Sequence, residues 1–131
     1  MAWNRTIAAL GLTAALALTG CGGTDDSLDA IAGDYVRMTL EIGQREDGYV
    51  DAYHGPPEWA TAAEADPRTV EQLRAAAAAL TGRLEDFPTR GLDEDEVQRR
   101  AYLLAHVGAA DARLRMIAGE EMAFADEAEA L

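Results

Sequence analysis

The sequence predicts an all-α protein, a small helical bundle of about three main helices with one or two short ones. Three observations support this fold class. Apolar residues recur at spacings of three and four in several segments, as on one face of a helix. Residues typical of helix caps precede these segments, and no stretch alternates with period two for long enough to form a convincing strand. The length of 131 residues is enough for one small domain.

The first main helix is expected to begin after Ser27 and to end near Gly43. The Ser27 hydroxyl can accept a hydrogen bond from a free backbone amide of the first turn, and Asp29 suits the positive end of the helix dipole. The apolar stripe of this helix consists of Leu28, Ile31, Tyr35, Met38 and Ile42.

The second main helix is expected between residues 66 and 86. Asp66 and Pro67 read as a cap followed by proline at the first helical position, and Thr69 with Gln72 can form a capping box one turn later. Five consecutive alanines at 75–79 favour helix and allow another helix to approach closely. The apolar stripe consists of Val70, Leu73, Ala77, Leu80 and Leu84.

The third main helix is expected from Asp93, which can form a capping box with Glu96, to about Ala118, where Gly119 stops it. Its stripe is Arg100, Leu103, Val107, Ala110, Leu114 and Ile117, widened by Leu104. Acidic residues after Phe124 suit the first turn of a further helix, so the segment 124–131 is either a frayed tail or a helix cut short. Because alanine is so frequent on the helix faces, we expect a thin core of marginal stability.

One segment, GYVDAYHGPPEW at 48–59, differs from its alanine-rich surroundings. Asp47 can cap a short turn that places Tyr49 and Tyr53 on one face, Pro57 suits the start of a new helix, and Trp59 is expected to pack back on the tyrosines. Two interpretations stay open. The segment is a rigid corner plugged by aromatic side chains, or Tyr49, Tyr53, His54 and Trp59 line a ligand groove.

The charge and the polar residues exclude several functions. The net charge is −13, and such a surface repels phosphate backbones, so no nucleic-acid partner is expected. The two histidines, His54 and His106, lack the spacing of a zinc site, and the acidic run 93–96 lacks the alternating ligands of a calcium loop. We therefore predict no catalytic residue, no metal ligand and no cofactor in this chain.

The N-terminal residues have the pattern of an export signal. Arg5 is followed by an apolar run from Ile7 to Leu18, which is too short for a confident membrane span, and by small residues at a cleavage site. Cys21 is the only cysteine. The sequence Leu18-Thr19-Gly20-Cys21 resembles the lipobox of bacterial lipoproteins, which implies lipidation of Cys21 and cleavage before it. An ordinary signal peptide with an incidental or buried cysteine is the alternative.

The lipobox resemblance implies a domain plan and a location. Residues 1–20 form the signal peptide, 21–27 a flexible tether and 28–131 the helical domain. The mature protein is exported and held, through acyl chains on Cys21, on the bacterial cell membrane or outer membrane.

The segment 48–59, together with Tyr35-Val36-Arg37, Leu40 and Ile42-Gly43, resembles the N-terminal part of a bacterial family of exported, metallopeptidase-like proteins of unknown function. His54 stands where a second tyrosine is expected. The zinc helix of that family lies far beyond this region, so the resemblance transfers no catalytic or metal residue. It implies that residues 28–131 are the N-terminal part of a larger domain.

Three hypotheses of function follow. The first is a membrane-anchored, non-catalytic helical fragment of a metallopeptidase-like protein. The second is a self-sufficient envelope lipoprotein that binds a protein or small ligand through the aromatic corner 49–59. The third, an enzyme in its own right, is disfavoured because the catalytic motifs sought in the sequence are missing.

Overall fold

The computed structural model describes residues 26–121 and Ala128, and in this part of the chain it contains four helices and no strand. The helices are α1 (Leu28–Gly43), α2 (Pro57–Ala65), α3 (Val70–Glu85) and α4 (Glu94–Ile117). The predicted all-α class and the small helical bundle are thus confirmed.

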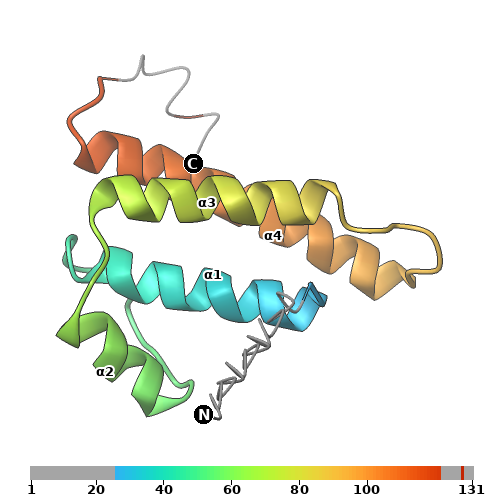
Figure 1. Ribbon diagram of the computed structural model, residues 1–131, viewed down its shortest axis with the longest axis horizontal. Helices are drawn as coiled ribbons and strands as arrows, with labels where there is room; N and C mark the ends of the chain where they lie inside the picture. Colours follow the sequence, from blue (N-terminus) through green and yellow to red (C-terminus); the bar gives the residue numbers. More distant parts are fainter. Residues whose placement is uncertain (1–25, 122–127, 129–131) are drawn as a thin grey trace, which may run out of the picture.

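The three long helices form the body of the bundle, as Figure 1 shows. Helix α3 runs beside α4, with which it makes the most extensive contact, and α1 packs against both. The short helix α2 packs on α1, on the side away from α4. Within the described residues, one long face of the α3–α4 pair therefore has no helix over it.

The predicted caps at Ser27, Thr69 and Asp93 are confirmed by their hydrogen bonds. The Ser27 hydroxyl accepts a bond of 3.1 Å from the Ala30 amide at the start of α1. Both capping boxes form, at Thr69 for α3 and at Asp93 for α4. Each satisfies amides that the first helical turn leaves without a partner, which fixes where the helix begins.

The predicted end of α4 is also confirmed. The helix ends at Ile117, and Gly119 has a φ of +84°. In this left-handed conformation a side chain would meet the backbone, so glycine is favoured there. The Gly119 amide donates to the Met116 carbonyl at 2.9 Å, which continues the turn that closes the helix.

Two local predictions were wrong. Asp66 does not open α3 but follows the last residue of α2, where its amide donates to the Ala62 carbonyl at 3.3 Å. Two cap signals one turn apart competed, and the capping box at Thr69 prevailed because it satisfies two backbone amides. The segment around Asp47 forms turns and bends rather than a helical turn, so Tyr49 and Tyr53 do not share a helical face.

The core consists of the predicted stripes of the three long helices. Its most deeply buried side chains come from all three: Ile31, Met38, Ile42, Leu73, Leu84, Val107 and Leu114. All buried side chains in the described residues are apolar. Ala77 and Ala110 are fully buried between these larger side chains, as expected where helices approach closely.

The predictions for the signal peptide, Cys21 and most of the tether lie outside the described residues, as does nearly all of the segment 122–131. They remain predictions.

Candidate functional site

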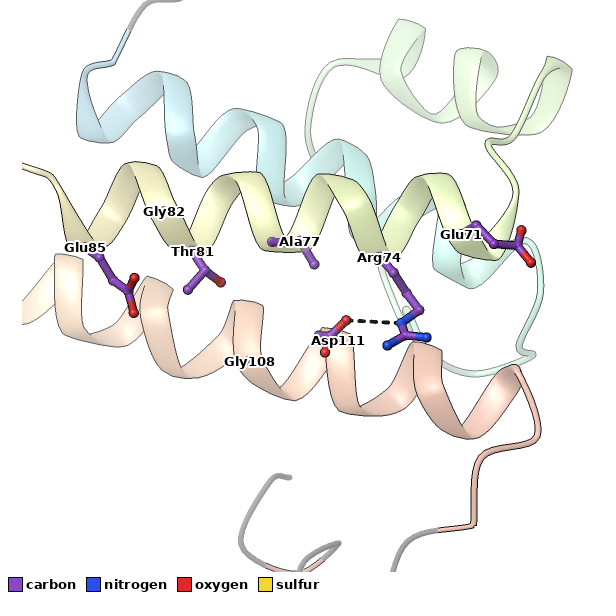
Figure 2. Close-up of a pocket in the computed structure, with 9 residues that line it drawn as sticks. Glu71, Arg74, Ala77, Thr81, Gly82, Glu85, Gly108 and Asp111 are labelled. Carbon is purple, nitrogen blue, oxygen red and sulfur yellow. Dashed lines mark ion pairs between the residues drawn. The ribbon is translucent and has the colours of Figure 1, made fainter.

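A groove of about 610 Å³ lies along α3 and α4 (Figure 2). Its floor and walls are small side chains with polar residues at both ends: Glu71, Arg74, Ala77, Ala78, Thr81, Gly82, Glu85, Gly108 and Asp111. Three carboxylates against one guanidinium make this groove net acidic. The groove is thus a shallow, small-residue channel with a negative rim.

Helix α4 carries a second apolar stripe beside this groove. Its members recur at helical spacing and are exposed or half-buried: Val97, Ala101, Leu104, Ala105 and Gly108. Val97 is 49% exposed, although valine prefers burial. At 3.6 residues per turn this stripe lies roughly a third of a turn from the buried one. Of this second stripe only Leu104 packs against the core cluster, so most of the stripe is not covered by the described residues.

Arg74 closes one end of the groove. Its Nη1 donates to Glu120 at 2.7 Å, while its Nε lies 3.6 Å from Asp111 as an ion pair. The Nε atom is buried and has no hydrogen-bond acceptor among the described residues. Because an unsatisfied buried donor costs free energy, an acceptor at this point would be stabilising.

The four residues of the predicted aromatic corner lie in different surroundings. Tyr49 is half-buried against the core. Tyr53 donates its hydroxyl hydrogen to the Pro56 carbonyl at 3.1 Å, and the side chain of His54 is exposed. Trp59 sits on α1 and not, as expected, on the tyrosines: its ring lies 4.0 Å from the Arg37 guanidinium and 3.5 Å from the Cβ position of Gly33.

Arg37 borders two further hollows, and Trp59 borders one of them. One, of about 500 Å³, lies beside the start of α1 and includes both residues. The other, of about 390 Å³, lies between α1 and α3 and has three arginines in its walls, Arg37, Arg68 and Arg83. Asp34 and Glu41 partly neutralise them. In a chain of net charge −13, this cleft has one more arginine than carboxylates in its walls, and each of these arginines is paired with one of the two carboxylates.

The ion pairs around the basic cleft join α1 to α3 and to the segment that leads into α3. Arg83 on α3 reaches Asp34 on α1 at 2.8 Å, and Arg68 donates to Glu41 at 2.7 Å. Burial raises the pKa of Glu41, but the hydrogen bonds and charge of Arg68 outweigh it, so the net pKa is lowered. The hydrogen bond to Glu41 likewise raises the pKa of Arg68. Both partners are therefore held in the charged form.

Aromatic rings meet on the opposite side of α1, next to α4. The His106 ring stacks on Tyr102 with centroids 3.7 Å apart and meets Tyr35 edge-on at 6.4 Å. His106 Nδ1 lies 2.9 Å from the Tyr102 carbonyl, which can only accept, so this nitrogen is the donor. Burial, followed by the neighbouring Tyr49 and Tyr102, raises the pKa of Tyr35 to about 12. The cluster is a packing contact with an exposed edge, since Tyr102 is 57% exposed.

The described residues contain no group of three His, Cys, Asp or Glu side chains arranged to hold a metal ion. Zinc chemistry, which the family resemblance associates with a later region, therefore has no ligand set in this part of the chain. None of the helices in residues 26–121 combines the length and apolar character that crossing a bilayer requires. Comparison of the chain with protein-family models, curated proteins and solved structures finds no match.

Sequence reasoning missed the arginines of the basic cleft and the second stripe of α4. The spacing of Asp34, Arg37 and Glu41, at i, i+3 and i+7, already places them on one face of α1. The apolar positions 97, 101, 104 and 108 likewise follow helical spacing. Both signals are present in the sequence but become meaningful only once the neighbouring helices are known.

Proposed function

We propose that this protein is a membrane-anchored bacterial lipoprotein whose helical body is a non-catalytic module that packs against another protein domain. The main support for a lipid anchor is the sequence Leu18-Thr19-Gly20-Cys21, which follows a short apolar run. Two or three acyl chains on one cysteine, at about 0.8 kcal/mol per buried CH₂, hold a protein firmly to a bilayer.

The start of α1 supports this arrangement. Leu28 opens α1 seven positions after Cys21, so the tether spans at most about 25 Å when extended. Arg83 holds Asp26 at 2.9 Å, and Arg99 holds Asp29 at 2.6 Å, so the start of α1 is tied to both α3 and α4. The acyl anchor thus keeps this end of the bundle close to the bilayer.

The electrostatics support a structural rather than catalytic body. A general acid or base works best with a pKa near the ambient pH. In this protein the pKa values of Glu41 and Glu46 are lowered, away from neutral pH, because their arginine partners stabilise the charged forms. Each of these carboxylates joins a helix to a segment between helices, which is the role expected of a scaffold.

Membrane fractionation tests the anchor. The full chain, expressed in a bacterium that processes lipoproteins, is expected in the membrane fraction, resistant to a high-salt wash and released by detergent. The Cys21→Ser variant is expected in the soluble exported fraction. A wild-type protein that is soluble, or a variant that stays with the membrane, contradicts the proposal. A frame encoding a His-Glu zinc helix in the DNA that follows supports the larger metallopeptidase-like protein.

The basic cleft favours a second candidate function, binding of a small anionic ligand. Arg37 lies between two hollows and against Trp59, so an anion there would approach the indole ring. Fluorescence titration of the full chain with succinate and with inorganic phosphate tests this function. A saturable change that Arg37→Met abolishes supports it, and no change with either anion contradicts it.

A further inference from the structure

We propose that the groove along α3 and α4 is a docking surface for one helix of a partner domain. This helix presents small or aliphatic residues to the groove and lysine or arginine at its flanks. The inference rests on the proposed function, in which the helical body packs against another domain, and it names the surface and the chemistry of the partner.

The shape of the groove fits a helix. It follows the two parallel ridges of α3 and α4, and Figure 2 shows the side chains of Thr81, Glu85 and Arg74 directed from α3 toward α4. Gly82 and Gly108 lie on the two walls. A Cβ added at either glycine would meet no atom within 4 Å, so a partner backbone can approach closely at both.

The exposed stripe of α4 supplies the apolar contact. Val97 is 49% exposed, and Leu104, half-buried, is in contact with the core cluster. Helices of globular proteins normally place one apolar stripe on the core and polar residues opposite it. A second stripe next to a groove is therefore typical of a helix that packs on two sides, and the described residues supply only one of them.

The charges of the groove select a cationic partner. Glu71, Glu85 and Asp111 line the groove together with Arg74, which is already paired with Asp111 and Glu120. A lysine or arginine of the partner helix can form an ion pair with Glu71 at one end of the groove or with Glu85 at the other. Complementary charge of this kind mainly provides specificity and a fast association rate.

The same charges disfavour a second copy of this chain and the segment 122–131 as occupants. A second copy carries the same net charge of −13. The segment 122–131 has three acidic residues and no basic one. Either would bring negative charge to a negative rim, which is repulsive.

Nuclear magnetic resonance on the full chain, ¹⁵N-labelled and held in a nonionic detergent, tests the inference. The probe is a synthetic amphipathic helix of about 18 residues, or five turns, with alanine and leucine on one face and lysine at the flanks. The control peptide carries glutamate in place of each lysine. We expect the lysine peptide to shift the amide resonances of Gly82 and Gly108 saturably, with an affinity that falls as salt is added.

Two matched variants make the test specific. Gly108→Leu places a bulky side chain at the groove wall, where an added Cβ meets no atom within 4 Å, and is expected to weaken binding at least tenfold, with an unchanged far-ultraviolet circular dichroism spectrum. Ala62→Leu makes a similar change on the exposed face of α2 and is expected to bind like the wild type. The inference is overturned if Gly108→Leu binds the lysine peptide as tightly as the wild type does, or if the glutamate peptide binds as tightly as the lysine peptide. It is also overturned if the resonances of Gly82 and Gly108 shift with protein concentration in the absence of peptide.

The failure of this inference is distinguishable from the failure of the proposed function. The Cys21→Ser variant removes the anchor but keeps the groove, so it is expected to bind the lysine peptide as the wild type does. If the wild-type protein binds the peptide but its Cys21 is not acylated, only the lipoprotein proposal is overturned. If the wild-type protein is acylated but does not bind the peptide, only the docking-surface inference is overturned.

Discussion

The carboxylate of Glu41 on α1 is held by Arg68, a residue 27 positions later in the segment between α2 and α3. Arg68 donates from Nη2 at 2.7 Å, from Nε at 2.9 and 3.0 Å, and from its own backbone amide at 2.8 Å. The Glu41 side chain is only 12% exposed. A single side chain on α1 thus fixes both the backbone and the guanidinium of the segment that leads into α3.

Removing this carboxylate is expected to destabilise the fold. Glu41→Gln loses the charge-assisted bonds and leaves the Arg68 guanidinium with a weaker partner, at a cost of about 1–2 kcal/mol. The value is reduced because Arg68 is 38% exposed and partly screened by water. Urea unfolding followed by circular dichroism measures the change, with Glu64→Gln, on the exposed surface of α2, as the matched control. Equal unfolding midpoints for Glu41→Gln and the wild type would contradict this role.

Acid is expected to weaken the same contacts. The pKa values of Glu41 and Glu46 are lowered in the folded protein from the ordinary value of 4.5, so the unfolded chain binds protons first as the pH falls. The stability from these pairs is complete above about pH 4.5 and is lost as the pH falls through the folded pKa values.

The unfolding midpoint measured from pH 7 to pH 3 reports this loss. Protonation also relieves the self-repulsion of an acidic chain, so the comparison with Glu41→Gln isolates the contribution of Glu41. The decline below pH 4.5 is expected to be shallower in the variant. A decline as steep as that of the wild type would show that Glu41 contributes none of it.

At alkaline pH the prediction concerns Tyr35. Its pKa of about 12 in the folded protein exceeds the ordinary value of 10.0, because burial disfavours the phenolate. The unfolded chain therefore loses this proton first, and the stability that Tyr35 contributes is complete below pH 10 and is lost as the pH rises toward 12. Tyrosinate absorbance should contain a late step that Tyr35→Phe removes. If all tyrosines of the folded wild type titrate together near pH 10, the burial of Tyr35 is not as described.

Three glycines allow a test of the helix boundaries. Gly82→Ala and Gly108→Ala are expected to stabilise the protein by about 0.5–1 kcal/mol each, because alanine is the better helix former and its Cβ meets no atom. Gly119→Ala, the same chemical change at a φ of +84°, is expected to destabilise it by about 1 kcal/mol. Thermal unfolding gives all three values. Equal signs at Gly108 and Gly119 would contradict the end of α4 at Ile117.

Local signals made much of the fold predictable. Ser27, Thr69 and Asp93 each accept a hydrogen bond from the amide three residues later, so their caps depend on short sequence distances alone. The buried stripes also follow from helical spacing. The wrong cap at Asp66 shows the limit of this reasoning, since two cap signals one turn apart compete and only the stronger determines the start of α3.

The candidate sites were less predictable because their partners are distant in sequence. Trp59 was recognised as a site residue, but its contact with Arg37 depends on how α2 packs against α1. Glu46 pairs with Arg113, 67 residues later, in the same way. The groove needs α3 and α4 side by side before the positions 82 and 108 become two walls of one channel.

The mass of the mature protein tests the central claim most directly. The full chain is purified from membranes with detergent, and its intact mass and N-terminal peptide are measured by mass spectrometry. We predict a protein that begins at Cys21 and carries a diacylglyceryl group on the sulfur. A chain that retains residues 1–20, or a mature protein with a free Cys21 thiol, would contradict the account.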